Sequence, residues 1–515
     1  MNRYYLTTAI DYGNAAPHIG HAYEKISADA LARHQRQRGR EVFFLTGLDE
    51  HGNKIEKAAI AAGTDPQSFV DGIAAEARAV WEALDISYDG FIRTTDPAHR
   101  NAVQAIYARL VSQGDIVRSR YEGWYCKGCE EFKNERDLGE DCTCPQHQMP
   151  LEFTSEENDV FLFSRYRDRL VAHYEANPDF LEPESRRNEI LNLLETFPDV
   201  SVSRQSVRWG IPVPGDATQV IYVWIDALSN YLTGIGYGSD EAMFKKWWPA
   251  QLHLVGKDIT KFHCLIWPAL LMALDLPLPE RVFGHGWVNA SGLKISKTIG
   301  NVIDPRDLVR DYGADAIRYY LLREIPFGRD GDFTQEAFEN RINADLANNL
   351  GNALNRTLAI LDKHFEGRVS PRHEAIEGDL PEATARAVEA VATHMDACAI
   401  DLAVAAIWEL LNAVNKYIDT TAPWALAKQG DRDALGGVLY TVLEALRHVA
   451  ILARPFIPTL AGKIWDQLGY DTGLADERWP ALAWGGLAVG QPTRKGGPLY
   501  PRIGSELAGA AKKKA

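Results

Sequence analysis

The sequence predicts an α/β fold, in which a Rossmann-like nucleotide-binding domain carries a zinc-knuckle insertion and is followed by an α-helical bundle. Three observations support this prediction. The N-terminal segment has the pattern of a strand, a helix and a second strand. Four of the six cysteines fall between Cys126 and Cys144. From about Glu336 onward, apolar residues recur at helical spacing over several long stretches.

The N-terminal segment indicates a strand–helix–strand unit. Residues 4–10 are rich in β-branched and aromatic side chains, which is typical of a buried strand, and residues 11–14 have turn chemistry. Apolar residues recur at helical spacing from Gly20, and residues 42–45 form the next strand. A parallel crossover is the expected connection, so we expect a ligand at the carboxyl ends of the strands, beside the start of the helix.

Two short motifs predict where a nucleotide binds. The sequence PHIGH at residues 17–21 falls at the strand-to-helix junction, where free N–H groups favour phosphate and Gly20 permits close approach. Alone, this motif is explained more simply by histidines that cap a helix. A second motif, KISKT at residues 294–298, lies in a loop flanked by Gly and Ser. Two imidazoles and two ammonium groups brought together make a cationic site for a nucleoside triphosphate, which we favour over capping alone.

The cysteine-rich segment predicts a metal site. It contains C-x-x-C at residues 126–129 and C-x-x-H at residues 144–147. In a cytosolic protein this pattern indicates a zinc knuckle rather than a disulfide framework, and four thiolate or imidazole ligands indicate a structural site. The alternative is a set of free thiols in a loop. We predict one structural Zn²⁺ per subunit, with Cys142 as an alternative to Cys144, bound by Cys126, Cys129, Cys144 and His147.

Composition narrows the class of protein. The 515 residues are enough for more than one domain, and the net charge of -15 argues against a protein that binds polyanions over its whole surface. A nucleic-acid partner would need a local basic face. We find no apolar run long enough to span a membrane and no secretory signal, so we expect a cytoplasmic protein without a membrane partner.

The remaining pattern divides the chain into five segments. Further strands are predicted at residues 219–225 and 252–258. Helices are predicted over residues 260–274, 344–361, 382–411, 435–456 and 458–468. We expect the first half of the nucleotide-binding domain at 1–115, the knuckle insertion at 116–215, the second half with the KISKT loop at 216–335, the helical bundle at 336–490 and a C-terminal tail at 491–515.

The two motifs, in this order, resemble the signature pair of class I aminoacyl-tRNA synthetases. Nearly the whole chain is similar to one family of that class, the methionyl-tRNA synthetases. The resemblance is carried by TAIDY at 8–12, TGLDEHG at 46–52, YVWIDA at 222–227 and GKDI at 256–259. The family's anticodon-binding pattern, in which Asn, Asn and Arg follow at four-residue steps with a distant Trp, is matched by Asn348, Asn352, Arg356 and Trp424.

The resemblance implies an ATP-dependent ligase of protein synthesis. Such an enzyme forms methionyl-adenylate from L-methionine and ATP, with Mg²⁺, and transfers the methionyl group to the 3′ end of tRNA(Met). The C-terminal dimerisation domain of some relatives is absent, so we expect a monomer. The implied catalytic residues are His18, His21, Lys294 and Lys297, and the implied ATP-binding residues are these four together with Gly20 and Ser296.

The resemblance also implies a pocket for methionine. A polarisable thioether packs well against aromatic rings, and Asp49 at a strand end can bind the substrate ammonium. Each aromatic residue alone is more often part of a core, but their coincidence with the family's pocket positions favours binding. The implied methionine-binding residues are Ala9, Ile10, Tyr12, Asp49, Trp224, Ala227, Tyr231, Ile259, His263 and Trp267.

The anticodon pattern has a physical basis as well. Spacing of four residues places Asn348, Asn352 and Arg356 on one helix face, from which amides and a guanidinium can read the edges of splayed RNA bases. Trp424 can stack on such a base. Without the resemblance, the two asparagines would be read as a polar helix face.

Three alternative functions remain open at this point. They are another class I synthetase, a small-molecule nucleotidyltransferase with the same histidine motif, and a non-catalytic tRNA-binding protein. A nucleotidyltransferase would not need the helical bundle. The presence of His18, His21 and Lys297 speaks against the non-catalytic alternative.

Overall fold

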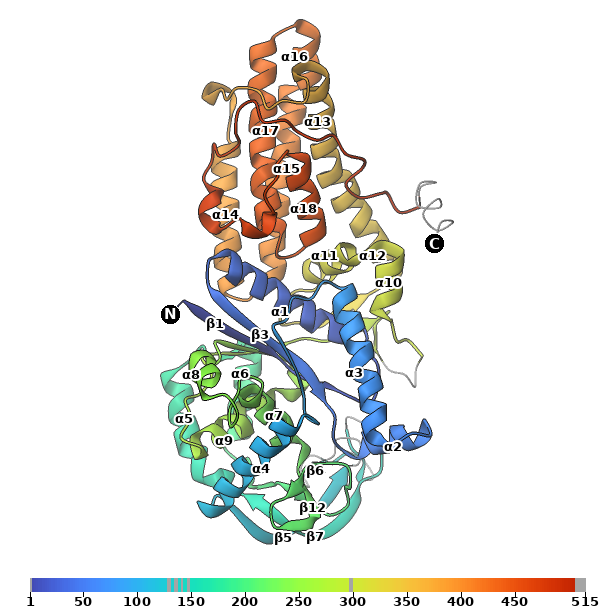
Figure 1. Cartoon of the computed structure of the whole chain (residues 1–515), viewed down its shortest axis with the longest axis vertical. Helices are drawn as coiled ribbons and strands as arrows, with labels where there is room; N and C mark the ends of the chain where they lie inside the picture. Colours follow the sequence, from blue (N-terminus) through green and yellow to red (C-terminus); the bar gives the residue numbers. More distant parts are fainter. Residues whose placement is uncertain are drawn as a thin grey trace.

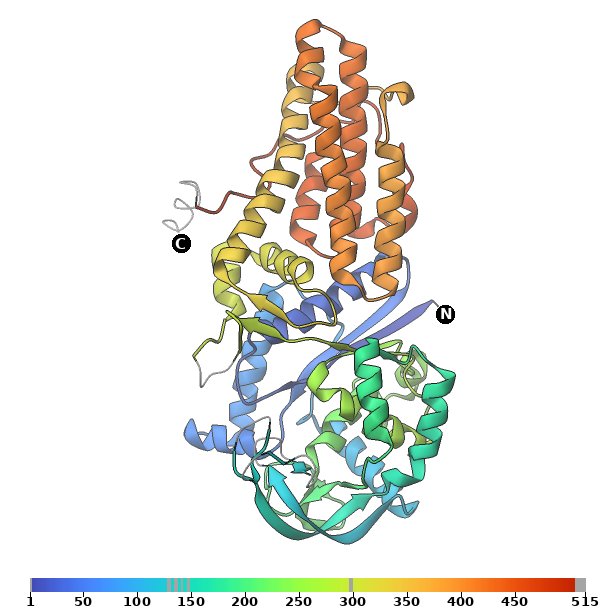
Figure 2. The same cartoon turned by 180° about the vertical axis from the view of Figure 1, so that it is seen from behind.

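The computed structural model describes residues 2–126, 131–133, 138–139, 142–145, 149–295 and 300–504. The molecule is elongated, with a sheet-based part at one end and a helical bundle at the other (Figure 1). Helix α1 (Ile19–Gln37) lies where the two parts meet, which both views show (Figures 1 and 2).

A parallel sheet of seven strands forms the centre of the sheet-based part. The strands are β1 (Arg3–Thr8), β2 (Asp11–Tyr12), β3 (Glu41–Asp49), β4 (Gly90–Arg93), β8 (Leu181–Glu182), β13 (Leu252–Gly256) and β14 (Val282–His285). Strand β3 pairs with β1, β2 and β4, and on from β1 the order is β13, β14 and β8. This order makes the space between β1 and β13 the switch point of a doubly wound fold, which is where such folds bind ligands.

Helices cover both faces of this sheet. They are α1, α3 (Pro66–Ala83), α4 (Pro97–Ser112), α5 (Arg167–Ala176), α6 (Glu184–Leu194), α7 (Val223–Thr233), α8 (Glu241–Trp247) and α9 (Trp267–Ala273), the last preceded by a π-helical turn, Phe262–Ile266. Helix α2 (Asn53–Ala61) packs against α3. The side chains of β1 alternate between the faces. Tyr4 and Leu6 join the core that includes α1 and α3, whereas Tyr5 joins the core that includes α7 and α9.

Two small antiparallel sheets follow α4. Their strands are β5 (Ile116–Cys126), β6 (Glu131–Lys133), β7 (Glu152–Phe161) and β9 (Val200–Ser201) in one sheet, and β10 (Ser203–Arg204), β11 (Pro212–Val213) and β12 (Asp216–Ile221) in the other. Strand β8 lies within residues 116–215, yet it is an edge strand of the main sheet.

The strand predicted at residues 219–225 is wrong in two respects. Strand β12 ends at Ile221 and pairs with β10 and β11 instead of the main sheet, and α7 begins at Val223. The apolar run continues through Leu228 and Leu232 at helical spacing. Over a window this short, an apolar run does not distinguish a buried strand from a buried helix.

A third small sheet and three helices lead from the main sheet to the bundle. They are β15 (Val288–Ala290), β16 (Leu293–Lys294), β17 (Gly331–Phe333), α10 (Pro305–Tyr312), α11 (Ala314–Glu324) and α12 (Gln335–Ile342). A π-helical stretch, Asn343–Leu350, then runs directly into the first long helix of the bundle. The bundle helices are α13 (Gly351–Phe365), α14 (Leu380–Asp396), α15 (Ile400–Thr421), α16 (Pro423–Gln429), α17 (Arg432–Ala453) and α18 (Pro458–Gln467).

The remaining predicted elements agree with the structure within a few residues, with one exception. The single helix predicted over residues 382–411 is two helices, α14 and α15. Cys398 stands between them with a φ of 54°, in the left-handed region that ends a helix. The chain reverses there, and α14 packs against α15.

Helix α17 has a composition that we did not expect from the sequence. By length and composition it is apolar enough to cross a membrane. Its apolar window is, however, 100% buried inside the bundle, where it packs against α14, α15 and α18. The apolar character of α17 is therefore that of a central core helix.

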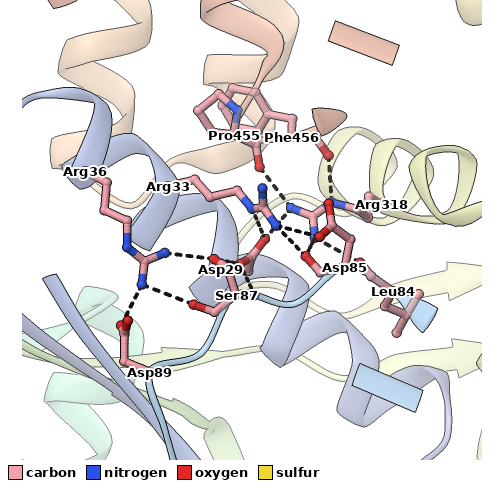
Figure 3. Close-up of polar contacts among 10 residues, drawn as sticks. All are labelled: Asp29, Arg33, Arg36, Leu84, Asp85, Ser87, Asp89, Arg318, Pro455 and Phe456. Carbon is pink, nitrogen blue, oxygen red and sulfur yellow. Dashed lines mark hydrogen bonds and ion pairs between the residues drawn. The ribbon is translucent and has the colours of Figure 1, made fainter. Parts of the chain in front are cut away.

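A buried ion pair joins the two parts of the molecule (Figure 3). The side chains of Arg318 on α11 and Asp29 on α1 are both fully buried, and Arg318 Nη2 lies 2.6 Å from Asp29 Oδ2. The same guanidinium donates to the carbonyl oxygens of Phe456 at 3.0 Å and Pro455 at 2.9 Å, between α17 and α18. It also donates to the Leu84 carbonyl at 3.2 Å, at the end of α3. Arg318 therefore ties α11, α3 and the bundle to α1.

Candidate active site

A cavity of about 780 Å³ lies at the switch point between β1 and β13. Residues that follow β1, β13 and β14 line it, together with the first turn of α1 and one face of α7. The predicted site residues that line it are Ala9, Ile10, Tyr12, His18, Gly20, His21, Asp49, Trp224, Ala227, Tyr231, Ile259, His263 and Lys294. Folding thus brings residues of both motifs and of the predicted methionine pocket to one cavity.

The first turn of α1 contributes two imidazoles to this cavity. His18 is the N-cap of α1, and its Nδ1 accepts a hydrogen bond from the Gly20 N–H at 3.1 Å. His21 Nδ1 accepts one from the His18 N–H, also at 3.1 Å. The two histidines therefore do cap the helix. Because Nδ1 is an acceptor in each ring, the proton of each neutral imidazole is on Nε2, a donor suited to a phosphate oxygen.

Burial sets the charge of this turn. Desolvation, together with the ammonium of Lys25, lowers the pKa of His21 to about 4. His21 is thus uncharged at neutral pH, so its ring contributes a hydrogen bond, and no positive charge, to the predicted cationic site. Gly20 is needed by the cap itself, because a Cβ at this position would lie 2.9 Å from a carbon of the His18 ring.

The structure describes part of the lysine motif. Lys294 lies over the indole of Trp287, with its Nζ 4.1 Å from the ring centroid. The Asn301 side chain donates to the Lys294 carbonyl at 3.1 Å, which links the two ends of the loop. Ser296 and Lys297 lie outside the described residues. The structure thus places the first lysine of the motif at the cavity and leaves the prediction for the second one open.

Asp49 lies at the end of β3, beside Tyr12. The two are register partners, because the short strand β2 pairs with the last residues of β3. The Gly13 N–H donates to the Asp49 carbonyl at 2.7 Å. A carboxylate held at a strand end in a cavity is placed to form a charge-assisted hydrogen bond with an ammonium group.

Aromatic side chains form the wall opposite Asp49's strand, and their polar atoms bond to one another. The Tyr231 O–H donates to His263 Nε2 at 2.7 Å, and His263 Nδ1–H donates to the Ile259 carbonyl at 2.9 Å. Burial lowers the pKa of His263 to about 4, which keeps this imidazole neutral. Trp224 stacks on Phe262 with ring centroids 3.6 Å apart. The wall is therefore an apolar aromatic surface of the kind that suits a thioether.

Trp267 lies behind this wall instead of on it. Its side chain is 1% exposed, and its ring centroid is 5.8 Å from that of Tyr231. Its indole N–H donates to His253 Nε2 at 3.2 Å. In this structure Trp267 supports Tyr231 from the core side.

A charged cluster, three of whose four members line the cavity, was not found from the sequence. The fully buried Lys25 has its Nζ 2.6 Å from Asp11 Oδ1 and 2.8 Å from Glu24 Oε1, and His285 Nε2 donates to Glu24 Oε2 at 2.8 Å. Burial raises the pKa of Glu24, but Lys25 and His285 outweigh it and hold that pKa at about 2. Burial raises the pKa of Asp11 to about 6. The sequence did contain a pattern from which part of this cluster could have been predicted: Glu24 and Lys25 follow His21 by three and four residues and so share its helix face.

Comparison with known proteins identifies the family. The family described as tRNA synthetases class I (M) matches residues 4–150 and 146–358, and the anticodon-binding domain of tRNA ligase matches residues 382–491. The methionine–tRNA ligase of Caldanaerobacter subterraneus subsp. tengcongensis is 49% identical over 518 aligned positions, which cover 99% of this chain and 81% of the relative. The chain belongs to the methionyl-tRNA synthetase family. The predicted family and its activity, methionine–tRNA ligation by a class I enzyme, are thereby confirmed.

Solved structures of methionyl-tRNA synthetases share the whole fold. The Mycobacterium tuberculosis enzyme in complex with methionyl-adenylate has a TM-score of 0.94 and 42% identity, over 98% of this chain and 100% of that one. The free form of the same enzyme has a TM-score of 0.86 and 40% identity, over 98% of this chain and 99% of that one. The α/β class I synthetase fold with a C-terminal helical region is therefore confirmed, and the chain is more similar to the adenylate-bound form than to that free form.

The anticodon pattern of the methionyl-tRNA synthetases lies on the surface of the bundle. Asn348, in the π-helical stretch, and Asn352 and Arg356, on α13, are all exposed. Trp424 on α16 is 47% exposed, and its ring centroid lies 5.1 Å from the guanidinium carbon of Arg356. The structure thus brings an exposed arginine and an exposed tryptophan together from two helices that are distant in sequence.

Two of the predicted zinc ligands pack together. Cys126 and Cys144 are buried in one small cluster with Leu151, whereas Cys142 is exposed. Cys129 and His147 lie outside the described residues. Among the residues that the structure describes, no three His, Cys, Asp or Glu side chains gather as a metal site, so the zinc knuckle stays a prediction.

We predict that His263 makes stability depend on pH. An unfolded imidazole takes up a proton near pH 6.5, whereas that of folded His263 does so only near pH 4. The stabilising contribution is fully present above pH 6.5 and is lost as the pH falls towards 4. His263→Gln can still accept from Tyr231 but does not titrate. Chemical denaturation at pH 7 and at pH 5 measures the unfolding free energies of the wild-type protein and the variant. We expect the difference between them to move by about 1–2 kcal/mol in favour of the variant as the pH falls from 7 to 5. A difference that stays constant would contradict the assignment.

Proposed function

We propose that this chain activates L-methionine with ATP to form methionyl-adenylate and then transfers the methionyl group to the 3′ end of tRNA(Met). One observation carries the proposal: His18, His21 and Lys294 line the same cavity as Asp49 and the aromatic wall. Phosphate-binding groups and amino-acid-binding groups therefore meet where both substrates must react. A small-molecule nucleotidyltransferase would have no use for the helical bundle, and a non-catalytic RNA-binding protein would have no use for this cavity.

The ATP-binding end of the cavity contains the two motifs. His18 and His21 donate from Nε2 to phosphate oxygens, at a helix N-terminus whose dipole favours anions. Lys297 stabilises the charge that develops on the departing pyrophosphate, and Lys294 helps to hold the loop closed. Gly20 and Ser296 complete the ATP site.

Mg²⁺ fits this end of the cavity. Asp258 lines it, and its Oδ1 accepts a hydrogen bond from the Trp287 indole N–H at 3.1 Å. A carboxylate oxygen is the ligand type that Mg²⁺ takes alongside substrate phosphates. When bound with ATP, the ion screens the charge of the triphosphate oxygens.

The methionine-binding end orients the nucleophile. Asp49 binds the substrate ammonium, and Tyr12, Trp224, Tyr231 and His263 surround the thioether. The methionine carboxylate then attacks the α-phosphorus, and the bond from phosphorus to the pyrophosphate oxygen breaks. In the second step, a ribose hydroxyl of the tRNA attacks the activated carbonyl and AMP leaves. Positioning and electrostatic stabilisation supply the catalysis, because the protein forms no covalent bond in either step.

Lys297→Ala tests the catalytic role of the second motif lysine. We expect a decrease in methionine-dependent ATP–pyrophosphate exchange of about 100-fold or more, as for loss of one donor to a developing oxyanion. Lys463→Ala, which removes an exposed lysine of α18 far from the cavity, serves as the matched control and keeps the wild-type rate. Near-normal exchange by the Lys297 variant would exclude this role.

The insertion is proposed to hold one structural zinc ion per subunit. The support is the burial of Cys126 and Cys144 side by side, since thiolates are soft ligands that suit zinc. The ion would cross-link the insertion, with Cys129 and His147 as the remaining ligands and Cys142 as the alternative to Cys144.

Metal analysis tests the zinc proposal. Purified protein should contain roughly one zinc per chain, and Cys126→Ser should lose it together with thermal stability, because a structural site contributes its binding free energy to folding. Cys264→Ser, which alters a buried cysteine of the catalytic core, is the control and retains the metal. Only trace zinc in the wild-type protein would refute the knuckle.

The bundle is proposed to read the anticodon of tRNA(Met). The support is the exposed face that carries Asn348, Asn352, Arg356 and Trp424, since polar groups next to an aromatic ring suit splayed RNA bases. Loss of one stacking platform weakens binding by about 1–3 kcal/mol.

Trp424→Ala separates the two functions. We expect the KM for tRNA in charging to rise by about tenfold, while ATP–pyrophosphate exchange stays at the wild-type rate. Exposed Leu402→Ala on α15 is the control and changes neither assay. An equal loss in both assays would show that Trp424 is a structural residue of the bundle.

We further propose the five-segment division of the chain given above, a cytoplasmic location and a monomeric state. Aminoacylation depends on tRNA and ATP, which are cytoplasmic substrates, and the one described helix apolar enough to span a membrane has its apolar window buried in the bundle.

A further inference from the structure

A buried network of one carboxylate and two imidazoles lies directly behind the methionine-binding end of the cavity. Its centre is Asp226 on α7, whose side chain is 1% exposed. Asp226 Oδ2 lies 2.6 Å from His51 Nδ1, and Oδ1 lies 2.6 Å from His99 Nε2. Both histidine side chains are also buried. None of the three residues lines the cavity, so none of them contacts a substrate bound there.

The hydrogen bonds of this network have a defined direction. Burial raises the pKa of Asp226, but the charge and hydrogen bonds of His51 and His99 outweigh it and hold that pKa at about 2. The carboxylate is therefore ionised and accepts from a ring N–H of each histidine. His99 Nδ1 is in turn 2.7 Å from Thr233 Oγ1, at the last residue of α7. The network thus holds α7 at two points.

Each arm of the network reaches a different wall of the cavity. His51 stands two residues after Asp49, in the turn that ends β3. The backbone of this turn is held by Trp209, whose indole N–H donates to the Glu50 carbonyl at 2.6 Å. Asp226 stands between Trp224 and Ala227, which line the opposite wall. The His51–Asp226 contact is therefore a side-chain link between the ammonium-binding carboxylate and the helix of the aromatic wall.

We propose that Asp226 is a positioning residue for methionine binding, which through His51 fixes the turn that carries Asp49 at its distance from α7. The inference rests on the proposed role of Asp49. Without the link, α7 and the end of β3 still pack in the same core, but the Asp49 carboxylate is no longer held where the substrate ammonium arrives. A charge-assisted hydrogen bond is lost when its partner is misplaced by an ångström or so, whereas apolar contact tolerates such a shift.

Because the hydrogen bond to the ammonium is sensitive to a small displacement and the apolar contacts are not, a positioning role of Asp226 can be distinguished from a general stabilising role. L-Methioninol keeps the ammonium and lacks the carboxylate, whereas the deaminated analogue of methionine keeps the carboxylate and lacks the ammonium. Both keep the thioether. A network that acts through Asp49 affects binding of the first analogue alone, and a network that merely holds the pocket together affects both.

The experiment measures inhibition of methionine-dependent ATP–pyrophosphate exchange by the two analogues in Asp226→Asn. We expect the inhibition constant of methioninol and the KM for methionine to rise by about tenfold, the effect of losing a hydrogen bond to a charged group. The KM for ATP and the inhibition constant of the deaminated analogue should change by less than about twofold. Equal weakening of both analogues, or no change in either, overturns the proposal.

Asp159→Asn is the matched control. Asp159 is also a buried carboxylate with two partners, a hydrogen bond from the Tyr107 O–H at 2.7 Å and an ion pair with Arg118 at 2.5 Å, but it lies in β7 away from the cavity. Its replacement costs stability without altering the constants for either analogue. Should Asp226→Asn fail to fold, His51→Gln removes the same link and must give the same selective loss.

Asp49→Asn distinguishes failure of this inference from failure of the proposed function. If Asp49→Asn weakens methioninol selectively and Asp226→Asn does not, the inference alone is overturned. If Asp49→Asn leaves methioninol binding unchanged, the ammonium role of Asp49 fails and the inference fails with it. Exchange that does not respond to methionine in the wild-type protein would overturn the proposed function itself.

Discussion

The buried ion pair between Arg318 and Asp29 is the constraint on which the orientation of the active site depends. Asp29 lies on α1, whose first turn carries His21 and whose last residue, Gln37, donates to the Ile451 carbonyl of the bundle at 2.7 Å. Removing one partner of a buried pair costs about 3–5 kcal/mol, whereas replacing both by apolar residues is often neutral or stabilising. The pair is therefore better understood as a device that fixes how α1 lies between sheet and bundle than as a net source of stability.

Orientation matters here because one helix carries several functional groups on one face. His21 and Glu24 line the cavity, and Lys25 forms an ion pair with Glu24. Consecutive residues of an α-helix differ in direction by about 100°, so a small rotation of α1 would move all of them together. The contact that Arg318 makes with the bundle thus determines which face of α1 a nucleotide meets. The same helix also supplies a counter-charge, since Lys25 offsets both Asp11 and Glu24.

The sequence alone was sufficient to predict those elements in which the local residue pattern and the chemistry of the motifs indicate the same structure. The strand–helix–strand unit, the two motifs and the bundle could be predicted because period, turn residues and motif spacing all agree. The strand predicted at 219–225 failed because a buried helix such as α7 and a buried strand share the same apolar composition over seven residues. The network at Asp226 could not be predicted, because His51, His99 and Asp226 come from three separate segments and only tertiary packing joins them. Burial also keeps His21 uncharged, and burial cannot be read from a motif.

The proposed pocket selects its substrate through polar atoms that are already satisfied. Both ring nitrogens of His263 are in hydrogen bonds, one with Tyr231 and one with the Ile259 carbonyl, and the low pKa of the ring keeps it uncharged. An ammonium or guanidinium side chain against this wall would lose its water without gaining a counter-charge from the wall itself, which costs several kcal/mol. A thioether has little water to lose and gains contact with Trp224 and Tyr231. Rejection of charged amino acids therefore follows from the internal bonding of the wall, whereas rejection of apolar isosteres depends on shape and yields only about 1–3 kcal/mol per methylene. Fixing the distance between that wall and Asp49 is consequently worth more to specificity than any further contact along the wall itself.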